Sequence, residues 1–163
     1  MNSKNLAFYN WGRNSKIKPK TISPKNYNEL KKIIKNKKFI VLGNKRSYGD
    51  VAINKRLLIS MKKFNQIKYF DEKNGIIECE SGVLLKDMTA KIIEGKWFVP
   101  ITPGTKYVSL GGMVANNVHG KNIKKNQLKY FIKEIRLLKI DNKIIVCSKK
   151  KNKKIFDLTI GGY

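Results

Sequence analysis

Three glycine-containing loops constrain the fold of this chain most, because each follows an apolar segment. They are GNKRSYGD at 43–50, PGT at 103–105 and SLGGMVANNVHGKN at 109–122. Glycine lets a backbone approach a ligand closely, and successive backbone N–H groups in such loops form concave anion sites. Two or three such loops that converge would cradle a pyrophosphate, whereas each loop taken singly is more typical of an ordinary turn.

The hydrophobic pattern around these loops predicts an α+β fold. Apolar residues at helical spacing predict helices over 24–36 and 84–93, the second ended by Gly95. Short apolar or alternating runs predict strands over 38–42, 57–61, 66–70, 76–80, 97–101, 130–140 and 143–147. We expect residues 1–22 to be irregular and the lysine-rich stretch 149–154 to be an exposed turn.

Helices and strands alternate early in the chain, and strands dominate late. This order predicts two compact α/β lobes, with a division near residues 58–65, so that about 1–62 form the first lobe and about 63–163 the second. The sequence has neither a GxGxxG nor a GxxxxGK[ST] motif, which argues against a classical dinucleotide fold and against a P-loop.

The strong positive charge has two interpretations. The chain has 36 Lys plus Arg against 11 Asp plus Glu, a formal net charge of +25, as expected of a protein that binds RNA or an anionic surface. However, 32 of the basic residues are Lys and only 4 are Arg, although the forked guanidinium suits phosphate better. The chain also has 21 Ile and 17 Asn, and Lys, Ile and Asn are all encoded by AT-rich codons. A bias toward such codons accounts for much of the positive charge, so we expect no specific nucleic-acid partner.

Other features restrict the class of protein. No apolar run approaches the roughly 18 residues that cross a bilayer, and the first residues lack the apolar stretch of a secretory signal, so we expect a cytoplasmic protein without a transmembrane segment. Cys79 and Cys147 are too few to form a disulfide framework, and with a single His no metal site is expected.

Four motifs in a fixed order carry a resemblance to a known family. Trp11-Gly12-Arg13, Arg46-Ser47-Tyr48-Gly49-Asp50, PGT at 103–105 and LGGMVANNVHGKN at 110–122 resemble the FAD-linked oxidases with the vanillyl-alcohol-oxidase fold. The resemblance covers about residues 8–163. Within that family, RSYGD together with HGKN is most similar to the decaprenylphosphoryl-β-D-ribose 2-oxidases. The resemblance implies a PCMH-type FAD-binding domain.

The resemblance also implies a set of cofactor-binding positions. The first loop would hold the FAD diphosphate through backbone N–H groups, a second cradle would begin at Gly104, and the segment that ends at His119 would line the flavin ring. The implied positions are Val41, Leu42, Gly43, Asn44, Lys45, Arg46, Ser47, Tyr48, Gly49, Asp50, Val51, Gly104, Ser109, Leu110, Gly111, Gly112, Asn116, Asn117, Val118 and His119. His119 would hydrogen-bond the flavin or a substrate hydroxyl, and no catalytic residue is assigned.

The residues by themselves leave structural roles open at several of these positions. His119 also suits a hydrogen-bonded loop histidine, Arg46 a surface charge, Tyr48 a packed aromatic and Asp50 a loop cap. The chain also departs from the family pattern. Lys45 stands where the family has Gly, and Asn117 where the nearest members have Asp. Many members carry a His at the position of Tyr48 and attach the flavin to it, so we expect FAD to be bound non-covalently here.

The resemblance implies an oxidoreductase that transfers a hydride to FAD from the CH–OH group of a sugar or a polyprenyl-phosphate sugar. In the family, a further C-terminal domain covers the flavin and binds the substrate, whereas this sequence ends at Ile160-Gly161-Gly162-Tyr163. We therefore expect weak or partner-dependent FAD binding, little turnover by this chain alone, and a separate chain as one source of the substrate domain. A basic RNA-binding or anionic-surface-binding protein and a non-catalytic flavin-binding module are the alternatives.

Overall fold

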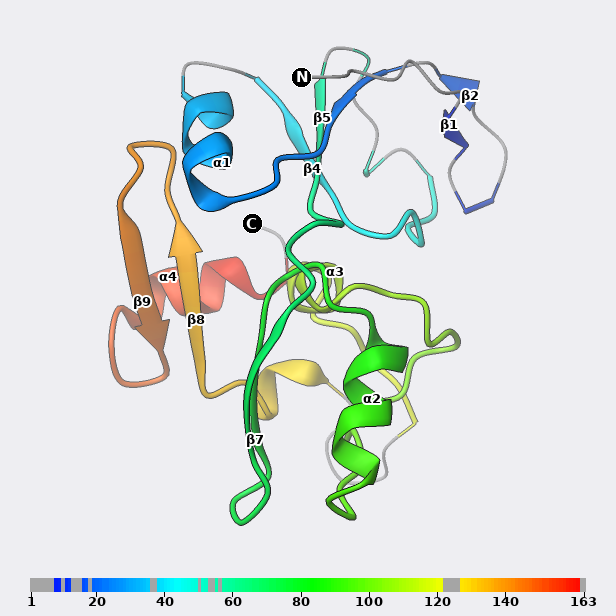
Figure 1. Ribbon diagram of the computed structural model, residues 1–163, viewed down its shortest axis with the longest axis vertical. Helices are drawn as coiled ribbons and strands as arrows, with labels where there is room; N and C mark the ends of the chain where they lie inside the picture. Colours follow the sequence, from blue (N-terminus) through cyan, green and yellow to red (C-terminus); the bar gives the residue numbers. More distant parts are fainter. Residues whose placement is uncertain are drawn as a thin grey trace.

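The computed structural model describes residues 8–9, 11–12, 16–17, 19–35, 38–49, 51–52, 55, 57–121 and 127–161. These residues form short helices together with parallel and antiparallel strands, which confirms the predicted mixture of helices and sheets. Figure 1 shows the parallel strands and α1 at one end of the molecule, and β7 and α2 extending toward the other. None of the described helices is long and apolar enough to cross a membrane.

A three-stranded parallel sheet forms the first part of the fold. Its strands are β3 (Lys20–Ile22), β4 (Ile40–Leu42) and β5 (Leu57–Ser60), in the order β3-β5-β4. All four residues of β5 are buried, as expected for the central strand of a parallel sheet. The chain before residue 22 is therefore not all irregular, because β3 completes this sheet. Two further short strands, β1 (Phe8–Tyr9) and β2 (Lys16–Ile17), pair antiparallel.

Helix α1 (Tyr27–Ile34) connects β3 to β4 and starts later than predicted. Asn26 caps it, because the side-chain oxygen of Asn26 accepts a hydrogen bond from the backbone N–H of Glu29 at 2.9 Å. Its buried residues Leu30, Ile33 and Ile34 pack in one cluster with residues of β5. The sheet is thereby covered on one face, and its strands end at a common edge from which the first loop leaves.

Two antiparallel hairpins form much of the remaining fold. Strands β6 (Ile67–Asp71) and β7 (Ile76–Cys79) pair as predicted, around the expected turn. Strands β8 (Glu134–Leu138) and β9 (Ile144–Ser148) pair in the same way. Arg136 of β8 links the two hairpins, since its Nη1 lies 2.9 Å from Glu78 Oε1 of β7.

Four helical elements accompany the hairpins. Helix α2 (Leu85–Ile93) was predicted, whereas α3 (Leu110–Ala115), the 3-10 helix η1 (Leu128–Tyr130) and α4 (Lys153–Thr159) were not. A buried cluster joins α2, α3 and η1 and consists of Val83, Leu85, Met88, Ile92, Val99, Met113 and Leu128.

Three sequence predictions in this part of the chain were wrong. Residues 97–101 form no strand, although Val99 and Ile101 are buried. The strand predicted from residue 130 begins only at Glu134, because η1 occupies its start. The lysine-rich turn ends at residue 152, where α4 begins, since Phe156 is buried against Cys147.

Candidate functional site

The first and third glycine-containing loops lie side by side. A Cβ added at Gly43 would lie 2.3 Å from the Oγ of Ser109, so glycine leaves room here for the Ser109 side chain. Asn44 strengthens the contact, since its Nδ2 donates to the backbone oxygen of Tyr107 at 2.7 Å. Residues more than sixty positions apart in sequence are thereby brought together, as the expected convergence of the loops requires.

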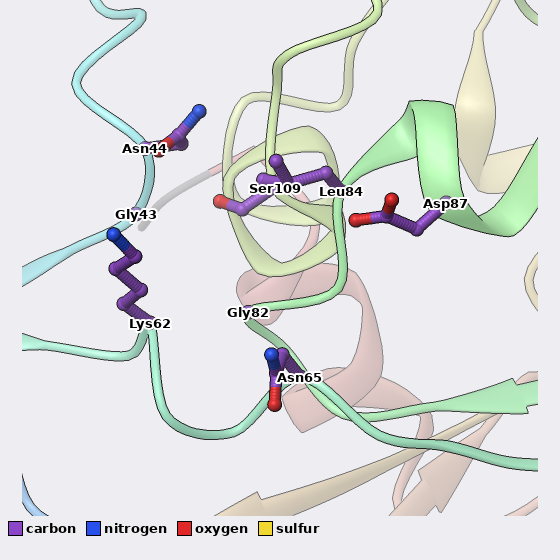
Figure 2. Close-up of a pocket in the computed structure, with 8 residues that line it drawn as sticks. All are labelled: Gly43, Asn44, Lys62, Asn65, Gly82, Leu84, Asp87 and Ser109. Carbon is purple, nitrogen blue, oxygen red and sulfur yellow. The ribbon is translucent and has the colours of Figure 1, made fainter.

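A cavity of about 210 Å³ opens at this contact. Figure 2 shows Gly43, Asn44 and Lys62 on one side of it and Ser109, Leu84 and Asp87 on the other. Its eight lining residues are Gly43, Asn44, Lys62, Asn65, Gly82, Leu84, Asp87 and Ser109. One positive and one negative side chain therefore face the cavity, and the carboxylate of Asp87 already pairs with the ammonium of Lys86.

Arg46 of the first loop is half-buried beside aromatic residues. Its Cζ lies 4.4 Å from the centroid of the Trp11 ring and 5.6 Å from that of the Tyr107 ring. Trp11 Nε1 donates to the hydroxyl of Tyr48 at 3.1 Å. The Nε of Arg46 is buried and has no hydrogen-bond partner among the described residues. A buried donor of this kind is matched by an acceptor in most structures, so the site suits an anion.

The segment from Ser109 is held by the rest of the fold. The N–H of Leu110 donates to Val83 O and the N–H of Gly111 to Ser81 O, both at 2.8 Å. Gly111 also packs tightly, because an added Cβ would lie 2.8 Å from the Cβ of Ser81. Leu110 and Gly111 were predicted to cradle a ligand, but these two N–H groups are already used within the protein. Any contact to a ligand must come from other atoms of these residues.

The second and third loops also meet. A Cβ added at Gly120 would lie 2.6 Å from the backbone oxygen of Thr102, just before Pro103-Gly104-Thr105. Gly104, in contrast, has nothing within 4 Å of an added Cβ and faces open space. The glycine of the His-Gly motif therefore has a packing role, while Gly104 leaves room for a ligand.

The polar residues before Gly120 bond within the segment and to residues 127–129. Asn116 Nδ2 donates to Gly112 O at 2.8 Å, and Asn117 Oδ1 accepts from the N–H of Lys129 at 3.1 Å. Asn117 also has a positive φ of 40°, a conformation that Asn tolerates well. His119 is exposed and pairs with Gln127 in an isolated β-bridge. Both asparagines thus shape the loop, and His119 is accessible to a ligand.

The positions of the first loop differ strongly in exposure. Leu42 is buried at 2% exposure, whereas Tyr48 and Val51 are each 70% exposed and Val41 is 55% exposed. Lys45 has a φ of 57°, a left-handed conformation that favours glycine. Asp50 lies outside the described residues, as does Arg13 of the Trp-Gly-Arg motif.

Sequence reasoning missed several residues around the site. Lys62 follows β5 as Gly43 follows β4, and neighbouring parallel strands end at the same edge of a sheet, so the strand pattern contained a signal for it. Tyr107 and Asp87 carried no such signal. Tyr107 is brought to the first loop by its hydrogen bond with Asn44, and Asp87 lines the cavity from the first turn of α2.

Comparisons with known proteins identify a family pattern and several relatives of this chain. The sequence pattern of a family described as FAD binding domain matches residues 19–148. The chain is 24% identical to L-gulonolactone oxidase of Mus musculus over 159 residues, which are 94% of this chain and 36% of that protein. It is 40% identical to decaprenylphosphoryl-β-D-ribose oxidase of Mycolicibacterium smegmatis over 85 residues, 51% of this chain and 18% of that protein. The chain thus spans about a third or less of these relatives.

Proposed function

Because the chain belongs to the FAD binding domain family, we propose that it holds FAD non-covalently between its glycine-containing loops, as the cofactor-binding part of a flavin-dependent oxidoreductase. The observation that carries the proposal is the contact between Gly43 and Ser109, which joins two loops that the family resemblance assigns to FAD. When bound, FAD supplies the capacity to accept a hydride. The protein binds and orients the cofactor.

The residues at the site fit an anionic dinucleotide. The buried Nε of Arg46 lacks an acceptor among the described residues, and a phosphate oxygen is a suitable partner for it. The cavity of about 210 Å³ is smaller than the roughly 300–1,000 Å³ typical of a whole ligand, so it suits one part of FAD. The open side of Gly104 provides further space at the surface.

The proposed binding residues form three groups. The first loop, which includes Asp50, faces the diphosphate, Gly104 and the run from Ser109 to Gly112 border it, and the segment 116–119 lies along the flavin ring. Tyr48 supports non-covalent binding, since a phenol cannot form the histidyl bond found in other members of the family. His119 is proposed to donate or accept a hydrogen bond at the flavin or at a substrate hydroxyl.

The proposed reaction is the oxidation of a CH–OH group in a sugar or a polyprenyl-phosphate sugar. Relatives are named for a gulonolactone, a decaprenylphosphoryl ribose and, in a bacterial protein 36% identical over 72 residues, a D-lactate. The same proposal divides the chain into two lobes near residues 58–65 and places the protein in the cytoplasm. It also includes a substrate-binding part, which is supplied by further sequence or by a separate chain.

The test is whether the purified chain retains FAD. We expect a change in the visible flavin spectrum when the chain is titrated with FAD, and release of all flavin to the supernatant on acid precipitation, because the bond is non-covalent. Absence of FAD retention by the wild-type chain, together with salt-dependent binding of RNA, would contradict the proposal and favour the basic binding protein. FAD retention without turnover, even with a substrate-binding partner present, would indicate the non-catalytic module.

A further inference from the structure

The side chain of Arg46 lies in a stack that joins three separate segments of the chain. Trp11 comes from the turn after β1, Arg46 from the loop after β4, and Tyr107 from the loop before α3. The guanidinium carbon lies 4.4 Å from the Trp11 ring centroid and 5.6 Å from that of Tyr107. Both distances are within the range of cation–π interactions, which are strongest with Trp.

Both aromatic residues are fixed by hydrogen bonds to the loops they contact. The N–H of Trp11 donates to Ser47 O at 3.2 Å, and its Nε1 donates to the Tyr48 hydroxyl at 3.1 Å. The backbone oxygen of Tyr107 accepts from Asn44 Nδ2 at 2.7 Å. The Trp11 ring is therefore held at the loop that carries Arg46, and the backbone of Tyr107 is held at the same loop.

Core packing does not explain this stack. Trp11 is 41% exposed and Tyr107 is 43% exposed, so much of each ring stays in contact with solvent. The two rings limit the rotation of the guanidinium. Without them, the Arg46 side chain would have many conformations in this loop. A planar group held in this way loses less freedom when it binds an anion through its edge.

We propose that Arg46 recognises the diphosphate of the dinucleotide through its side chain, and that Trp11 and Tyr107 are positioning residues that hold it for this purpose. The inference rests on the proposed function and names the side chain that recognises the cofactor's charge. Its support is the place of Arg46 in the first loop, three residues after Gly43, and its buried Nε, which has no hydrogen-bond partner among the described residues. A guanidinium edge matches phosphate oxygens, and its donors are stronger than neutral ones.

The test measures the Kd for FAD by flavin fluorescence, with inorganic pyrophosphate as a competitor and salt concentration as a variable. We expect Arg46→Met to weaken FAD binding about 30-fold, to abolish competition by pyrophosphate, and to lower the salt slope of log Kd by about one. Arg46→Lys should fail to restore FAD binding, because an ammonium lacks the planar, forked donor geometry of a guanidinium.

Trp11→Leu should weaken FAD binding about 5-fold and Trp11→Phe less than 2-fold. Lys143→Met, which removes one exposed positive charge from the β8–β9 turn, is the control and should leave Kd unchanged.

The outcomes separate this inference from the function on which it rests. If the wild-type chain binds neither FAD nor pyrophosphate, the proposed function and the inference both fail. If the wild-type chain binds FAD and Arg46→Met binds it equally well, the inference alone fails. Loss of affinity in Arg46→Met or Trp11→Leu with an unchanged salt slope and a lower unfolding temperature would show a merely structural role and would also overturn the inference.

Discussion

The loop after β4 and the segment that begins at Ser109 meet at the same site but are held in different ways. The segment from Ser109 is tied to the fold by backbone hydrogen bonds of Leu110 and Gly111 and by the close approach of Gly120 to Thr102. The loop after β4 instead presents exposed side chains such as Tyr48, a left-handed Lys45, and an Arg46 whose Nε has no partner in the described part of the chain. The segment from Ser109 is thus a preformed frame held by its backbone, whereas the loop after β4 is joined to its neighbours largely through side chains such as Asn44 and Tyr48.

The largest expected effect comes from breaking the frame. Gly120→Ala should destabilise the protein by about 3 kcal/mol, because its Cβ would meet the backbone of Thr102, which cannot move aside as a flexible side chain can. Gly104→Ala is the matched control and should change stability by less than about 0.5 kcal/mol, since its Cβ would meet nothing within 4 Å. Urea unfolding followed by circular dichroism measures both. Equal stability of the two variants would show that the segment is no frame.

A second effect concerns the strand that leads to Ser81. Burial, with a smaller contribution from Glu78, raises the pKa of Cys79 to about 11, so the thiol stays protonated at pH 8. In a Cys147→Ser background, iodoacetamide should therefore react with Cys79 about 100-fold more slowly than with an ordinary cysteine. The alkylation rate should rise with pH until the pH reaches the raised pKa of about 11. The free energy of unfolding should fall between the ordinary thiol pKa and this raised pKa, because the thiol of the unfolded chain loses its proton at the lower pH. Rapid alkylation at pH 8 would mean that this strand is open to solvent.

Lys45 tests the backbone conformation of the first loop. Lys45→Val should destabilise the protein by about 1–2 kcal/mol, because a β-branched residue is poorly accommodated at a φ of 57°. Lys45→Gly should stabilise it by about 0.5 kcal/mol, since relief of the left-handed strain slightly exceeds the entropic cost of glycine. Thermal unfolding of the two variants tests the assignment, and a Gly variant less stable than the Val variant would refute it.

The smallest effect tests the comparison directly. In hydrogen exchange, the amides of Leu110 and Gly111 should be protected before FAD is added and should change less than about two-fold afterwards. Amides of the loop after β4 should gain several-fold protection when FAD binds. Mass spectrometry of peptic fragments resolves the two segments. If both gained protection to the same degree, the distinction between frame and ligand-binding loop would be lost.

Several elements of the fold were predictable because they depend on local pattern. The hairpin of β6 and β7 follows from alternation around Asn74-Gly75, and α2 follows from its apolar spacing and from Gly95. Strand β3 and helix α4 were missed, since neither has a strong pattern of its own. Each forms because a partner is present: β3 pairs with β5, and Phe156 of α4 packs on Cys147.

The order of the motifs determined what this protein is, and the tertiary structure decided how the motifs are used. RSYGD, PGT and HGKN indicated an FAD-binding domain because specific glycines and polar residues are needed where a backbone meets a cofactor. Only the folded chain placed Trp11 and Tyr107 around Arg46 and gave Gly120 a packing role against Thr102. The physical reason is that contacts between distant segments depend on the close packing of whole elements, which local sequence patterns do not encode.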